Sequence, residues 1–120
     1  MSGLFEVYFR DGSSRAGVLN TSHGNVDTPA FMPVATQGSV KALAPDDLKT
    51  LGASILLSNT YHLMLRPGID LIHRQNNLHT FMNWQRPILT DSGGFQTFSL
   101  GRLTNMSDSG VIFRSHIDGR

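Results

Sequence analysis

The sequence has 120 residues, of which 39% are hydrophobic and 16% are charged. This balance excludes a disordered tail and fits a soluble globular protein. The formal net charge is only +1, which excludes a protein that binds nucleic acid through a strong positive field alone.

The lengths of the apolar runs and the residue types exclude further classes. No run is long enough for a membrane span, and the first residues lack the basic and apolar regions of a signal peptide. We therefore expect a cytoplasmic protein with no membrane partner. The sequence contains no cysteine, and its five histidines lack the helical spacing of paired metal ligands. No metal site is expected within this chain.

Residues 1–29 predict an antiparallel meander. Alternating apolar residues indicate the first strand, and the Asp11-Gly12 sequence after it is typical of a tight hairpin turn. A second turn is expected at residues 21–25. The three strands are expected at residues 5–10, 15–19 and 26–28.

A short strand and a helix are expected next. Residues 31–34 form an apolar run whose internal proline suits an edge or crowded strand. Pro45, followed by two acidic residues, indicates a helix start, because proline fits the first turn and carboxylates complement its free N–H groups. Leu48 and Leu51 would be buried on one face of this helix, and Gly52 would end it.

The following residues predict a second strand and two helical segments. Residues 53–57 are apolar enough for a strand that is buried on both faces, as parallel strands are. The polar residues 58–62 are expected to form a loop after it. A second helix is expected at residues 69–75 and one further helical turn at residues 78–82. The buried stripe of the second helix would consist of Ile69, Leu71 and Ile72.

Residues 88–90 predict the third strand of this series. Strands and helices therefore alternate, which indicates a parallel sheet and an α/β fold. Residues 110–116 alternate between apolar and polar again, and Asp118-Gly119 is typical of a hairpin turn. We expect a single partial domain, with the meander at residues 1–29 and βα units at residues 30–120.

The candidate site begins directly after the third strand. Asp91 alone would suggest a loop carboxylate or a helix cap, but catalytic groups of parallel α/β folds lie at the carboxyl ends of strands. Gly93 and Gly94 allow a ligand to approach the backbone closely and leave their N–H groups free to bind it, beside Ser92. Phe95 is either a core aromatic or a platform on which a base stacks.

Two amide side chains are candidates for supporting residues. Asn59 and Gln96 would either bond to loop backbone or orient Asp91. The second role is favoured for Asn59, because two adjacent parallel strands bring their ends together. The nearby Tyr61, His62 and Met64 are interpreted as packing and loop residues rather than catalytic ones.

The Asp-Ser-Gly-Gly sequence also occurs around the nucleophile of trypsin-like proteases. Those proteases need an all-β double barrel and an upstream histidine and acid, whereas here the motif follows βα alternation. We therefore set aside the interpretation of Ser92 as a hydrolase nucleophile, although a fluorophosphonate probe would test it directly. The glycine pair is also too short for a phosphate-binding loop.

Three motifs, in the same order, resemble the N-terminal part of bacterial tRNA-guanine transglycosylase (queuine tRNA-ribosyltransferase). They lie at residues 29–34, 59–68 and 89–96, within a resemblance that extends from about Phe5 to Arg120. The resemblance implies a modified TIM (β/α)8-type barrel that removes guanine from the wobble position of tRNA and inserts a 7-deazaguanine precursor of queuosine. Its implied partners are tRNA and the 7-deazaguanine base, and it allows a homodimer of the full-length protein.

The resemblance also implies roles for the candidate residues. Asp91 would be the acid/base carboxylate that exchanges protons with the departing and incoming bases. The backbone of Ser92, Gly93 and Gly94 and the ring of Phe95 would form the base pocket, with Phe95 in place of a tyrosine found in some members. Stacking needs only the ring, so this change should be tolerated.

In the family, other parts of the pattern lie after the position that corresponds to residue 120. They are the nucleophilic aspartate, several base-reading residues and the Cys/His zinc site, so no cofactor is expected within this chain. A TIM barrel needs about 250 residues. We therefore expect a fragment or truncated product that is inactive alone and carries half of an active site. The alternative is a non-catalytic chain of the same family that binds tRNA or a partner.

Overall fold

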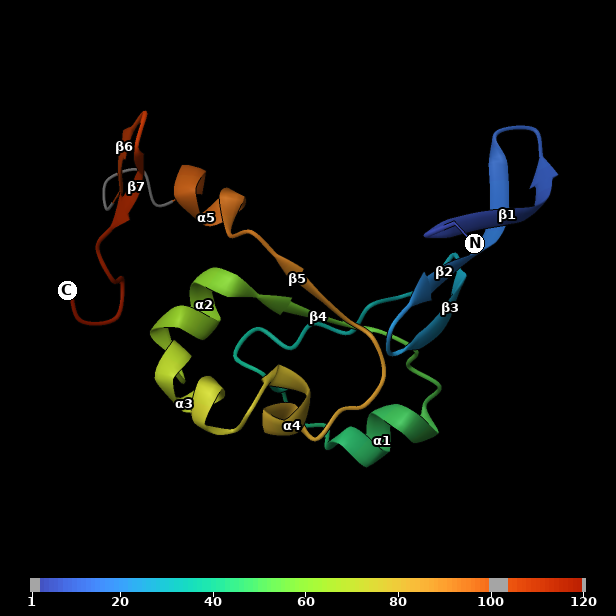
Figure 1. The fold of residues 1–120 in the computed structure, drawn as a ribbon, viewed down its shortest axis with the longest axis horizontal. Coiled ribbons are helices and arrows are strands. Elements are labelled where there is room, and N and C mark those ends of the chain that lie inside the picture. Colours follow the sequence, from blue (N-terminus) through green and yellow to red (C-terminus); the bar gives the residue numbers. More distant parts are fainter. Residues whose placement is uncertain (1–2, 100–103, 120) are drawn as a thin grey trace.

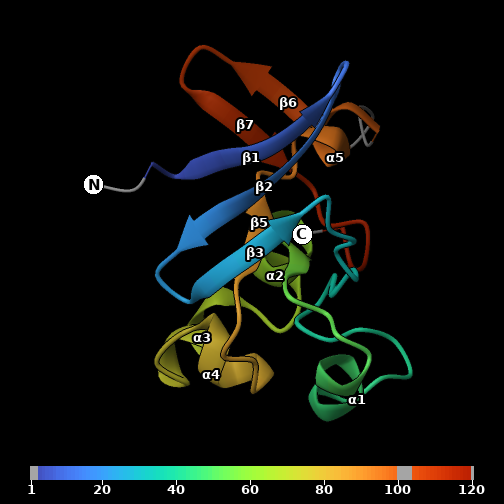
Figure 2. The ribbon, with the colours of Figure 1, turned by 90° about the vertical axis from the view of Figure 1, so that its right-hand side faces the viewer.

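The structure is a computed structural model that describes residues 3–99 and 104–119. The predicted antiparallel meander is confirmed, with the strand order β1-β2-β3. Its strands are β1 (Phe5–Asp11), β2 (Ser14–Thr21) and β3 (Gly24–Thr28). The meander lies at one end of the longest dimension of the molecule (Figure 1), and Figure 2 shows its strands face on.

Three segments run parallel to one another after the meander. Two of them form the predicted parallel pair, β4 (Leu56–Asn59) and β5 (Ile88–Asp91). The strand predicted at residues 31–34 is wrong, because only Val34 forms an isolated parallel bridge, to Leu57. The bridge consists of two hydrogen bonds: the N–H of Leu57 donates to the carbonyl of Pro33 at 3.0 Å, and the N–H of Ala35 donates to the carbonyl of Leu57 at 2.7 Å.

Five short helices and a hairpin complete the described fold. The helices predicted to begin at residues 45, 69 and 78 are confirmed. The helices that begin at residues 60 and 94 were not predicted. The helices are α1 (Pro45–Thr50), α2 (Thr60–Leu65), α3 (Ile69–Arg74), α4 (Leu78–Met82) and α5 (Gly94–Ser99). The hairpin consists of β6 (Thr104–Ser107) and β7 (Gly110–Phe113), so the alternation predicted to reach residue 116 ends three residues earlier. Within the described ranges, no helix has the length and hydrophobicity needed to cross a bilayer.

Helix α1 begins and ends as predicted. The backbone N–H of Ala44 donates to the Asp47 carboxylate at 2.8 Å, and Gly52 follows the helix with a φ of +82°. Leu48 is 4% exposed, but the prediction that Leu51 is also buried is wrong, since it is 71% exposed. Leu51 is the C-cap, so it lies beyond the last turn and past the core.

The boundary between β4 and α2 differs from the prediction. The strand expected at residues 53–57 begins at Leu56 and continues through Asn59. Residues 58–62 do not form a loop, because α2 starts directly after the strand. Asn59 is its N-cap, and the Asn59 side chain accepts a hydrogen bond from the backbone N–H of His62 at 3.1 Å. Of the polar residues that indicated a loop, Ser58 and Asn59 end the strand, Asn59 caps the helix, and residues 60–62 form its first turn.

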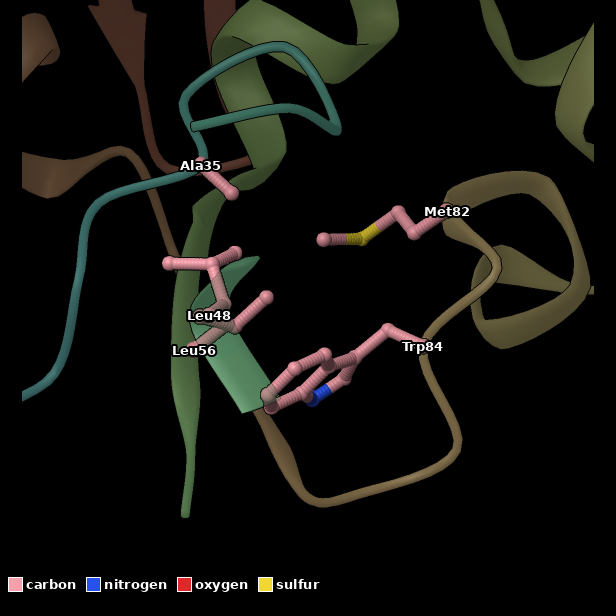
Figure 3. Packing of buried hydrophobic residues seen from close by; sticks show 5 residues of the cluster. All are labelled: Ala35, Leu48, Leu56, Met82 and Trp84. Carbon is pink, nitrogen blue, oxygen red and sulfur yellow. The ribbon is translucent and has the colours of Figure 1, made fainter. Parts of the chain in front are cut away.

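The core lies between β4, α1 and α4. Its buried cluster consists of Ala35, Leu48, Leu56, Met82 and Trp84 (Figure 3). Trp84 is fully buried, and its indole Nε1–H donates to the backbone carbonyl of Pro87 at 3.1 Å. The stripe predicted for α3 is wrong, since α3 has no buried residue. Ser58, near the carboxyl end of β4, is fully buried, and its hydroxyl donates to the backbone carbonyl of Ala35 at 3.0 Å.

Candidate active site

Asn59 and Asp91 lie directly opposite each other at the carboxyl ends of β4 and β5. The side-chain Nδ2 of Asn59 lies 2.9 Å from Oδ1 and 2.9 Å from Oδ2 of the Asp91 carboxylate. Asn59 is 7% exposed, whereas Asp91 is half-buried. The parallel register therefore presents one carboxylate at the sheet edge and places an amide donor beside it.

Asn59 is itself held on its other side. Its Oδ1 caps α2, and its Nδ2 also lies 3.2 Å from Oε1 of Gln96, in the first turns of α5. Of the two supporting amides suggested by the sequence, Asn59 at the end of β4 contacts Asp91 directly, whereas Gln96 on α5 contacts Asn59. Rotation of Asn59 away from the carboxylate would break the α2 cap as well, so the amide is fixed in its orientation.

Gly93 supplies the second donor group, and the third contact, to the carboxylate. Its backbone N–H donates to Oδ1 of Asp91 at 2.8 Å. Gly93 has a φ of +75°, a conformation that favours glycine. A Cβ atom at this position would lie only 2.9 Å from Cβ of Tyr61. Both the backbone conformation and the close contact with Tyr61 therefore require glycine here.

The other predicted site residues surround this carboxylate without touching it. Ser92 is exposed, and no histidine within the described ranges is hydrogen-bonded to it, so a Ser-His pair is not formed there. Gly94 is the first residue of α5 rather than part of a long glycine loop. Phe95 follows on α5 and is 75% exposed, which contradicts the alternative that it is a core aromatic.

One contact of this region was not anticipated from the sequence. The Tyr61 hydroxyl, on α2, lies 3.0 Å from Nδ1 of His116. Tyr61 is 3% exposed, and its ring also meets His62 edge to face at 5.2 Å. Only the alternation of residues 110–116 was noted in the sequence, and that pattern does not indicate a partner 55 residues upstream.

The described residues include histidine, aspartate and glutamate side chains, which can ligate a metal ion. Among these residues, no group of three or more His, Asp or Glu side chains is arranged to hold a metal ion.

Known proteins match this chain over almost its whole length. The sequence model of a family described as "Queuine tRNA-ribosyltransferase" matches residues 11–120. Proteins described by the same words are 62% identical in Lawsonia intracellularis and 60% identical in Nitratidesulfovibrio vulgaris, each over 98% of this chain. A third, from Dictyoglomus turgidum, is 54% identical over 97% of this chain. The chain covers 32%, 31% and 30% of these relatives, respectively, and so spans about a third of their length.

Proposed function

The chain belongs to the queuine tRNA-ribosyltransferase family, and from this premise we propose that it supplies half of a base-exchange site. The complete protein would exchange guanine at the wobble position of tRNA for a 7-deazaguanine of the queuosine pathway. This chain would carry the acid/base carboxylate, Asp91, and the pocket for the base. The observation that carries the proposal is the carboxylate held by three hydrogen-bonding contacts at a strand end.

The hydrogen bonds of Asp91 suit a group that handles the protons of a base. An ionised carboxylate has about four lone-pair sites. Among residues 3–99 and 104–119, contacts from Asn59 and Gly93 occupy both sites on Oδ1, whereas Oδ2 has one contact, from Asn59. Oδ2 therefore retains a site for an N–H of a purine-like base. Asp91 would give a proton to the departing guanine and take one from the incoming base.

The second carboxylate of the reaction would come from the part of the complete protein that this chain does not cover. A carboxylate nucleophile attacks C1′ of the ribose, the guanine leaves with a proton, and the covalent intermediate is resolved by the second base, as in retaining glycosidases. The target nucleotide must leave its stack for this attack. The exposed ring of Phe95 beside the Ser92-Gly93-Gly94 backbone is suited to receive the base by stacking.

The wider organisation is proposed on the same premise. Residues 30–120 would form the first βα units of a TIM-type barrel, in which Val34, β4 and β5 contribute the first parallel segments, and residues 1–29 would be the added meander. A zinc site and a homodimer would belong to the complete protein, with tRNA as its partner in the cytoplasm. With a net charge of +1, most phosphate contacts to tRNA would come from outside these residues.

The proposal is tested by base exchange in the full-length protein that contains this chain. Labelled guanine and a labelled 7-deazaguanine are each incubated with a substrate tRNA, and incorporation at the wobble position is measured. We expect incorporation of both bases. Salt-sensitive tRNA binding without incorporation would overturn the enzymatic proposal and favour the non-catalytic alternative.

A further inference from the structure

Tyr61 links His116, which its hydroxyl contacts, to Gly93, which lies beside its Cβ. The Tyr61 hydroxyl and Nδ1 of His116 are 3.0 Å apart, and the two rings lie nearly parallel with their centroids 5.8 Å apart. Figures 1 and 2 both show the C-terminal segment beside α2, the helix that carries Tyr61. The pair therefore joins the segment after β7 to the helix that starts at the site.

Tyr61 is in direct contact with the backbone of Gly93. A Cβ atom built on Gly93 would lie 2.9 Å from Cβ and 3.6 Å from the backbone nitrogen of Tyr61. Gly93 is thus packed against Cβ and the backbone of Tyr61. Because Gly93 donates its N–H to Asp91 at 2.8 Å, a shift of Tyr61 would change the direction of that hydrogen bond.

His116 is held in place by the turn that contains it. The Oγ of Ser115, which is 8% exposed, accepts hydrogen bonds from the backbone N–H groups of Ile117 at 3.2 Å and Asp118 at 3.4 Å. The N–H of Gly119 donates to the carbonyl of Ser115 at 2.8 Å. The ring of His116 also meets His62 edge to face at 5.7 Å. His116 is therefore a fixed partner for Tyr61.

From these contacts, we propose that His116 is a positioning residue for Asp91 and acts through Tyr61 and Gly93. The hydrogen bond between His116 and the Tyr61 hydroxyl keeps Tyr61 against Gly93, and Gly93 in turn keeps its N–H directed at Oδ1 of Asp91. His116 itself does not touch the carboxylate. This inference rests on the proposed function, because it concerns the same carboxylate.

The test uses variants of the full-length protein that remove or replace the hydrogen-bonding groups of the pair. Tyr61→Phe removes only the hydroxyl, and His116→Phe keeps a ring but removes Nδ1. His116→Asn retains a polar group close to the position of Nδ1. We expect Tyr61→Phe and His116→Phe each to lower kcat for base exchange about threefold to tenfold with KM for tRNA unchanged, and His116→Asn to recover most of the loss. The double variant with both Phe changes should be no slower than either single variant.

Two controls separate this effect from a general loss of stability. Tyr8→Phe and His73→Phe change the same residue types at exposed positions on β1 and α3, and both should keep the wild-type kcat. The thermal midpoint is measured for every variant. Unchanged kcat in both Tyr61→Phe and His116→Phe would overturn the inference. A loss that follows the thermal midpoint, with no recovery in His116→Asn, would also overturn it.

A readout besides activity distinguishes this inference from the proposed function. In protein labelled with ¹⁵N-glycine, hydrogen exchange of the Gly93 amide is expected to be faster in Tyr61→Phe and His116→Phe than in wild type, and unchanged in Tyr8→Phe. If the wild-type protein incorporates no base into tRNA, the proposed function fails. The rate of hydrogen exchange of the Gly93 amide still tests the positioning contact in that case. Equal Gly93 exchange in all variants would show that the pair does not act on this backbone.

Discussion

Asn59 and Asp91 are paired across parallel strands, and a single nitrogen of Asn59 lies 2.9 Å from both oxygens of the Asp91 carboxylate. The same Asn59 side chain caps α2 through its oxygen. The orientation of the proposed acid/base group is therefore coupled to the formation of a helix, and this coupling can be tested by substitutions that separate the two roles.

Asp91→Asn should lower the rate of guanine exchange into tRNA by about 10²- to 10⁴-fold, which is the usual contribution of a general acid/base. The amide is nearly the same size but cannot exchange a proton with the base. The measurement is label incorporation by the full-length protein, and the matched control is Asp70→Asn, at an exposed position on α3. A wild-type rate in Asp91→Asn would remove this carboxylate from the mechanism.

Asn59→Ser should lower base exchange about tenfold to hundredfold with little loss of stability. Serine can still cap α2, but it is too short to reach the Asp91 carboxylate, and hydrogen bonds to a charged group are lost. Asn59→Ala should lose the cap as well, at a further cost of about 1 kcal/mol in the free energy of unfolding.

The matched control for Asn59 is Asn77, which caps α4 by accepting from the N–H of Thr80 at 2.8 Å. Asn77→Ala should also cost about 1 kcal/mol of stability but leave the exchange rate unchanged. Exchange rates and urea unfolding are measured on the same preparations. Equal activity in Asn59→Ser and wild type would mean that Asp91 needs no support from this amide.

Phe95→Ala should weaken binding of a 7-deazaguanine by about 1–3 kcal/mol, the usual contribution of one stacked base. Because Phe95 is 75% exposed, its removal should leave the thermal midpoint unchanged. Phe95→Tyr should retain the affinity, since the ring is kept. Phe31→Ala, at a residue that is 83% exposed, serves as the control in the same binding titration. If the 7-deazaguanine binds to Phe95→Ala as tightly as to wild type, the ring does not stack on the base.

Acidification should destabilise the protein through His79. Its ring stacks on His23 with the centroids 3.6 Å apart, and its buried Nε2 has no hydrogen-bond partner among the described residues. Burial lowers the pKa of His79 below the ordinary value of 6.5, the neighbouring charge of His23 lowers it further, and a backbone hydrogen bond with Arg86 opposes both. The unfolded chain therefore takes up a proton at a higher pH than the folded protein does.

The sign of this effect follows from the lowered pKa. The stabilisation is complete above pH 6.5 and is lost as the pH falls from there through the folded-state pKa. Thermal midpoints of the full-length protein are measured between about pH 8 and about pH 5. His79→Gln should lose less stability on acidification than wild type, whereas His73→Gln, at an exposed position, should lose as much as wild type. Equal losses in wild type and His79→Gln would exclude this contribution.

Much of the fold could be predicted because its signals are local. Asp11-Gly12 makes a hairpin turn whatever surrounds it, and proline and two acids at Pro45 start a helix through their own backbone preferences. The errors arose where one residue type is common in two different local structures. Asn59 indicated a loop but caps a helix, and Leu51 fits an apolar stripe but lies past the end of α1.

The sequence by itself determined the family, the antiparallel meander, the alternation of strands and helices after it, and the position of Asp91 at a strand end. Only the tertiary structure decided which side chains meet there. The contact between Asn59 and Asp91 depends on the register of two strands, and His116 reaches Tyr61 across 55 residues of chain. Such contacts are produced by packing among distant segments rather than by the preferences of neighbouring residues, so no local pattern reveals them.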